Sequence, residues 1–149
     1  ASLVQPVVNG FWMASKLARA PYRWAAGPEL TNLAAVPAGA TVTLTARADD
    51  ARFNNSEGAE PAQSITGVAV YLQPPWQPGV TPIAQMQPAD GGWNATAENV
   101  TVDIPATALQ AGRQLVYLRA TDAAGNQGPV GAVFVTVGAP DPLFANGYE

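Results

Sequence analysis

The chain has 149 residues, of which 12% are charged, with a net charge of -4 at pH 7 and neither cysteine nor histidine. Its seven Lys and Arg residues are scattered, so no basic stripe is present to neutralise nucleic-acid phosphates or anionic lipid. No run of about 18 apolar residues predicts a membrane span. Without His or Cys, a thiolate zinc site and the usual acyl-transfer dyads are excluded, and we expect no enzyme activity.

The N-terminal part of the chain predicts a short helix followed by a linker. Residues 9–20 carry apolar side chains four apart, and Pro21 ends the pattern because proline cannot continue a helix. Residues 21–29 have no period and are rich in proline and glycine, which is typical of an extended linker. We interpret residues 1–29 as the end of a preceding domain with its linker.

From residue 30 onward the apolar period changes to two, which predicts β-strands. In residues 40–48, Val42 and Leu44 alternate with threonines, as a half-buried strand requires. Further strands are predicted at 65–73, 99–104, 113–120 and 130–137, and weaker ones near 30–36 and 80–86. Gly- and Pro-rich turns separate these runs, with no helix between them. The pattern predicts an all-β antiparallel sandwich of about seven strands over residues 30–138, followed by a tail at 139–149.

One segment resembles a known domain class. Residues 119–126 (Arg-Ala-Thr-Asp-Ala-Ala-Gly-Asn), preceded by alternating Val116 and Leu118, resemble the penultimate strand and following turn of bacterial immunoglobulin-like (Ig-like) and fibronectin-like domains. Gln114 stands where many relatives begin that strand with tyrosine, so a tyrosine corner is not implied. The resemblance implies an Ig-like sandwich.

A second resemblance covers most of the chain. It is carried by residues 52–56 (Arg-Phe-Asn-Asn-Ser), 60–61 (Glu-Pro), 74–76 (Pro-Pro-Trp), 112–113 (Gly-Arg) and 122–126 (Asp-Ala-Ala-Gly-Asn), with 16–22 and 26–28 upstream. Together these look like the accessory domain that follows the catalytic domain in some secreted bacterial zinc carboxypeptidases. The resemblance implies that the zinc ligands and catalytic residues belong to the parent enzyme, and no residue of this chain inherits those roles.

The C-terminal residues also carry a resemblance. Residues 141–149 end in Phe-Ala-Asn-Gly-Tyr-Glu, which is similar to a short ending on exported proteins of some Gram-negative bacteria. It implies a secreted or extracytoplasmic location. The alternative is an ordinary frayed terminus.

Oxygen-bearing side chains gather in two loops that share one end of an Ig-like sandwich. The first loop, 49–64, offers Asp49, Asp50, Asn54, Asn55, Glu57 and Glu60, and the second offers Asp122 and Asn126. Calcium takes six to eight oxygen ligands. We therefore predict a calcium site formed by Asp49, Asp50, Asn55, Asp122 and Asn126. The alternative is that these residues make turns by bonding to their own backbone.

Large aromatic residues suggest contact surfaces. Trp76 and Trp93 lie in or beside turns, where an exposed indole can stack on sugars or anchor a protein partner. The alternative is that each covers an open end of the core. Phe11, Trp12 and Leu17 of the predicted helix form either an interface with a catalytic domain or a surface packed on the sandwich.

These expectations combine into one functional hypothesis and two alternatives. The leading one is a non-catalytic accessory domain of a secreted zinc carboxypeptidase precursor, which packs on or positions the catalytic domain or assists export and maturation. The first alternative is a module that tethers its parent to a polysaccharide or protein substrate. The second is a structural, adhesin-like Ig domain. No nucleic acid or membrane partner is expected.

Overall fold

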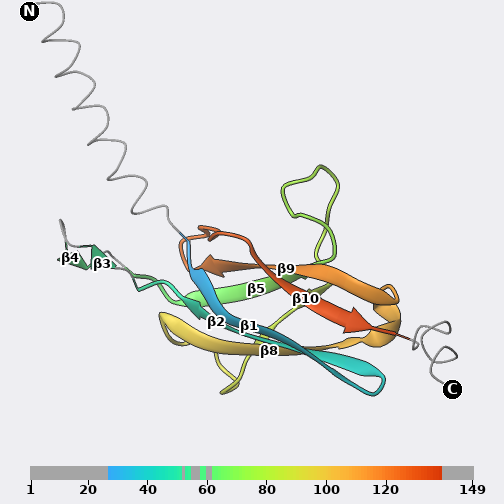
Figure 1. Ribbon diagram of the computed structural model, residues 1–149. Helices are drawn as coiled ribbons and strands as arrows, with labels where there is room; N and C mark the ends of the chain where they lie inside the picture. The colour runs from blue at the N-terminus through green and yellow to red at the C-terminus, as the bar shows by residue number, and fades with distance from the viewer. Residues whose placement is uncertain (1–26, 52, 55–57, 60–61, 139–149) are drawn as a thin grey trace, which may run out of the picture.

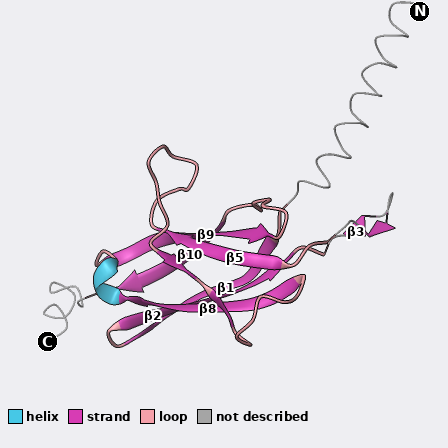
Figure 2. Cartoon of the chain, turned by 180° about the vertical axis from the view of Figure 1, so that it is seen from behind, coloured by secondary structure: helices cyan, strands magenta, loops and turns pink. Residues whose placement is uncertain are grey.

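The computed structural model describes residues 27–51, 53–54, 58–59 and 62–138 (Figure 1). The helix predicted at 9–20 and the tail at 139–149 lie outside the described residues. Within those residues the regular structure is β-strand, apart from one 3-10 turn, η1 (Ala106–Ala108) (Figure 2). The prediction of an all-β fold is confirmed.

Two four-stranded antiparallel sheets form the body of the domain. The first has the order β1-β2-β8-β7 and consists of β1 (Glu29–Ala38), β2 (Thr41–Asp49), β8 (Ala97–Pro105) and β7 (Gln87–Pro88). The second has the order β10-β9-β5-β6 and consists of β10 (Gly131–Val137), β9 (Gly112–Asp122), β5 (Ile65–Tyr71) and β6 (Ala84–Gln85). A separate ribbon pairs β3 (Phe53–Asn54) with β4 (Gly58–Ala59). In Figure 1 the sheets form two layers of a β-sandwich.

The long strands coincide with the predicted runs, and the short ones do not. The run predicted near 80–86 is strand only at β6, and β7 was not predicted at all. Pro88 explains why β7 is short and lies at a sheet edge, because proline has no N–H to donate to a ladder. A strand of two residues is too short to show the alternation of apolar and polar side chains in the sequence.

The core lies between the sheets and follows from the alternation along each strand. Val42 and Leu44 of β2 are fully buried, whereas Thr43 between them is not. Val116 and Leu118 of β9 are buried in the same way from the opposite sheet. Each such side chain stabilises the fold by about 1.5–3 kcal/mol through removal from water. The inner faces of the two sheets therefore hold the domain together.

Just before β1, two glycines allow the backbone of residues 27–28 to lie against the backbone of residues 127–128. A Cβ atom on Gly128 would overlap the Pro28 carbonyl, and one on Gly27 would overlap the backbone of Gln127. Gly128 is itself fixed to β9, since its N–H donates to the Ala120 carbonyl at 2.9 Å. We call the contact of residues 27–28 with residues 127–128 the glycine clamp. It fixes where the chain before Pro28 leaves the domain.

Candidate functional site

Three of the predicted calcium ligands, Asp50, Asp122 and Asn126, lie at one end of the sandwich. Asp50 follows β2 of the first sheet, and Asp122 ends β9 of the second. Both carboxylates are buried, with exposed fractions of 2% and 1%. Gln63 lies between them: its backbone N–H donates to Asp50 Oδ2 at 2.7 Å. With its amide nitrogen turned toward the acids, Nε2 lies 3.1 Å from Asp50 Oδ2 and 3.2 Å from Asp122 Oδ2.

We call Asp50, Gln63 and Asp122 the carboxylate bridge, because it links the end of one sheet to the end of the other. Asp122 also organises the turn that follows it. Its Oδ1 accepts hydrogen bonds from the backbone N–H groups of Ala124 and Asn126, each at 2.9 Å. Its Oδ2 accepts one from Asn126 Nδ2 at 3.1 Å. Asp and Asn side chains commonly stabilise turns by such hydrogen bonds to nearby backbone groups.

The Asp50 and Asp122 carboxylates already accept hydrogen bonds from N–H groups, and a bound cation would have to displace these donors. Asn126 directs its side-chain nitrogen toward Asp122, so in this geometry the two do not act together as oxygen ligands. Within the described ranges, no three acidic side chains gather into a group able to hold a metal ion. Calcium binding stays a prediction without support from these contacts.

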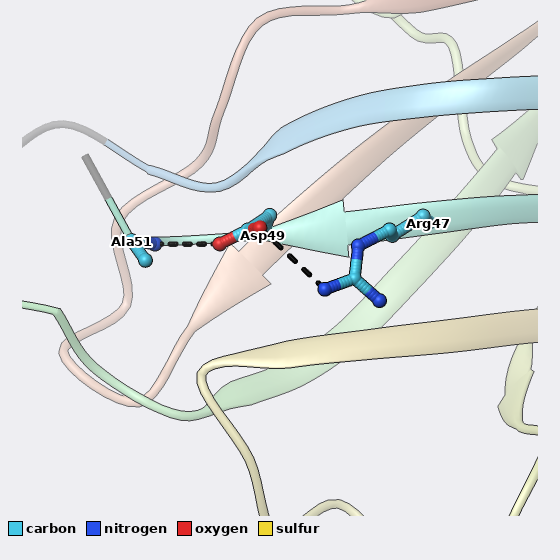
Figure 3. A network of polar contacts seen from close by, with 3 residues as sticks. All are labelled: Arg47, Asp49 and Ala51. Atoms are coloured by element: carbon cyan, nitrogen blue, oxygen red, sulfur yellow. Dashed lines mark hydrogen bonds and ion pairs between the residues drawn. The ribbon is translucent and has the colours of Figure 1, made fainter. Parts of the chain in front are cut away.

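Asp49 lies apart from the carboxylate bridge, on the outer face of β2. Its Oδ1 accepts a hydrogen bond from the Ala51 N–H at 2.8 Å, and its Oδ2 lies 3.8 Å from an Arg47 guanidinium nitrogen (Figure 3). Both side chains are more than 30% exposed, so the ion pair contributes about 0–1 kcal/mol. Asn55, like Glu57 and Glu60, lies outside the residues whose side chains are described.

A second cluster lies on the solvent side of the β10-β9-β5-β6 sheet. Trp76, in the connection between β5 and β6, is 67% exposed, and its ring meets the edge of Tyr117 at a centroid distance of 6.3 Å and an angle of 78°. On β10, Phe134 is 53% exposed and carries the Arg113 guanidinium 3.8 Å above its ring centre. We call Trp76, Tyr117, Phe134 and Arg113 the aromatic face.

A groove of about 490 Å³ runs beside the aromatic face. It is lined by Leu72, Gln73, Pro74, Ala108, Gln110, Arg113, Gln114, Leu115, Tyr117 and Phe134. Three of these are glutamines, and Arg113 is the one charged residue among them. The volume falls in the range of about 300–1,000 Å³ that is typical of ligand sites.

The two tryptophans predicted as ligand contacts are placed differently. Trp76 projects into solvent and does not cover the core. Trp93 is partly buried and packs against the core cluster. Tyr117, Phe134 and Arg113 were not predicted from the sequence as site residues. The alternation of side chains along β9 and β10 could have pointed to them. Val116 and Val135 face the core, so the residues that alternate with them face solvent.

The predicted interface residues Phe11, Trp12 and Leu17 lie outside the described residues. Among the residues that are described, no helix is long and apolar enough to cross a membrane. Comparisons with protein-family models, curated proteins and solved structures find no match to this chain.

Proposed function

We propose that this chain is a non-catalytic Ig-like accessory domain of an exported bacterial zinc carboxypeptidase precursor, which positions the catalytic domain or assists its maturation. The resemblance that covers most of the chain supports the parent enzyme, and the resemblance of residues 141–149 supports export. The strand order supports the Ig-like description, because β1-β2-β8-β7 and β5-β9-β10 correspond to the ABED and CFG sheets of that fold. The absence of His and Cys supports a role without catalysis.

The observation that carries the proposal is the glycine clamp. A domain that positions its neighbour needs a fixed junction, because a free linker leaves domain orientation undefined. Here Gly27 and Pro28 are seated directly on residues 127–128. Arg119 of β9 donates a hydrogen bond from Nε to the Gly128 carbonyl at 3.0 Å, which links the glycine clamp to β9.

The proposal is tested in two ways. The residues encoded upstream of Ala1 should contain a His-x-x-Glu zinc motif followed by the rest of a carboxypeptidase domain. The purified chain, given Zn²⁺ and a peptide with a free C-terminus, should release no amino acid. Metal-dependent C-terminal trimming by the purified chain, free of any parent enzyme, would refute a non-catalytic role.

A second candidate function is tethering of the parent protein to its substrate. The observation that favours it is the exposed Trp76 beside the groove, since aromatic residues are enriched among the anchors of binding surfaces. Pull-down of the purified chain on insoluble polysaccharides tests this candidate. A chain that stays entirely in the supernatant with every polysaccharide would count against tethering to sugars.

A further inference from the structure

We propose that the aromatic face and its groove bind a polysaccharide strand whose sugars carry carboxylate groups. This inference rests on the tethering function and names its ligand class and site. The site offers three kinds of contact on one surface: a flat exposed ring, amide groups and one positive charge. Each kind selects for a different property of the ligand.

The flat ring is the Trp76 indole. At 67% exposure it presents area to solvent that a sugar ring can cover, and Tyr117 supports it edge-on. The connection that carries Trp76 is held by its own turns. The Gln77 N–H donates to the Pro74 carbonyl at 3.0 Å, and the Val80 N–H donates to the Gln77 carbonyl at 3.3 Å. A ring held in place before binding loses less conformational freedom on binding.

The amide groups are Gln73, Gln110 and Gln114, which line the groove. A glutamine side chain both donates and accepts hydrogen bonds, as does a sugar hydroxyl. Gln114 is positioned by a hydrogen bond from its Nε2 to the Gln110 carbonyl at 2.8 Å. The groove wall therefore suits a ligand with many hydroxyl groups.

The charge is that of Arg113. Its guanidinium carbon lies 3.8 Å above the centre of the Phe134 ring, and the N–H groups of a guanidinium point outward in its plane. That geometry matches a carboxylate, which accepts two parallel hydrogen bonds from arginine. Among the residues that the structure describes, no acidic one lines the groove, although the whole chain has a net charge of -4. The groove is thus locally suited to an anion.

A peptide fits this surface less well. Sheets that bind extended peptides do so by pairing backbone groups at an edge strand. This sheet has two edge strands. β1 packs alongside β10, with Leu30 and Leu33 close against Gly131, and β6 is only two residues long. The aromatic face offers side chains instead of backbone groups, and this favours a sugar polymer.

The test is affinity electrophoresis and calorimetry of the full chain with polygalacturonate, alginate and hyaluronate, and with methyl-esterified polygalacturonate as the uncharged match. We expect binding to at least one acidic polymer. Trp76→Ala should weaken it at least tenfold, or about 1.4 kcal/mol. Arg113→Gln should weaken it and remove its salt dependence between about 50 and about 500 mM NaCl.

Matched controls lie on the other sheet. Val36→Ala truncates an apolar side chain of comparable exposure, 57%, on β1, and Arg47→Gln removes an exposed charge on β2. Both should bind like the wild-type chain. Circular dichroism and the melting temperature establish that each variant is folded, and Trp76→Phe, which keeps a ring, should bind with intermediate affinity.

The outcomes separate the ligand class from the tethering function. Binding to uncharged polymers only, lost in Trp76→Ala, would overturn the acidic class and leave tethering intact. Binding to a peptide library through this face, with no sugar binding, would also overturn the inference. An absence of any Trp76-dependent binding would overturn both the inference and tethering.

Discussion

Replacing Asp122 with alanine tests whether the carboxylate bridge holds the two sheets together at this end. The carboxylate is 1% exposed and accepts three hydrogen bonds from Ala124 and Asn126, in addition to its contact with Gln63. Hydrogen bonds to a charged group contribute about 1.5–3 kcal/mol each. Because the turn relaxes and water enters after truncation, the losses do not add fully. We expect Asp122→Ala to lower the free energy of unfolding by about 3–5 kcal/mol.

The assay is urea unfolding followed by circular dichroism and by tryptophan fluorescence. Asp90 provides a matched control, since its Oδ1 accepts a single hydrogen bond from the Gly92 N–H at 3.1 Å in an exposed turn. Asp90→Ala should cost about 1 kcal/mol or less. If Asp122→Ala does not fold, Asp122→Asn replaces it, because that variant keeps the Oδ1 acceptor. A loss at Asp122 no greater than that at Asp90 would refute a structural role for the bridge.

Three further predictions concern the junction, the core and the ion. Gly128→Ala should cost about 1–3 kcal/mol, because its Cβ would overlap the Pro28 carbonyl, whereas Gly67→Ala, which meets no atom closer than 4.0 Å, should change stability by about 0.5 kcal/mol or less. Equal effects in urea unfolding would contradict the clamp. Leu118→Ala should cost about 2–5 kcal/mol, since the side chain is fully buried, and a smaller loss would mean that the core collapses onto the cavity. The melting temperature in EDTA and in about 1 mM CaCl₂ tests the predicted ion site, and an unchanged value would mean that the N–H donors keep the Asp122 carboxylate. A calcium-dependent rise would support the predicted ion site.

The long strands were readable from sequence because burial imposes a period of two over many residues. In β2, Val42 and Leu44 face the core and Thr43 between them does not, so the pattern matches the structure residue by residue. Of the two-residue strands, β6 lies inside the run predicted near 80–86, which overstated its length, and β7 was not predicted. Strands this short are fixed by the neighbouring strand that they pair with, and a single sequence does not show that neighbour. Length of the periodic run, more than residue type, decided what could be predicted.

The candidate sites show the same division. Asp50 and Asp122 could be placed at one end of the sandwich because strand order fixes which loops are neighbours. Gln63 could not be identified, because its role as a bridge depends on side-chain distances that a sequence does not contain. Trp76 was noted by its residue type and by its place in or beside a turn. Its position above Tyr117 depends on the path of a long loop, which has no period to read.

Stability and binding are assigned to different parts of this domain, and that separation can be measured. The carboxylate bridge lies at the ends of β2 and β9, whereas the aromatic face lies on the solvent side of β9 and β10. Asp122→Ala should therefore reduce the free energy of unfolding and leave the affinity of the folded protein for an acidic polysaccharide unchanged. Trp76→Ala should have the opposite pair of effects, because a side chain that is 67% exposed contributes little to the core. If both variants lost stability and affinity together, the two sites would be coupled through β9, and the aromatic face could not be treated as a surface carried on an independent scaffold.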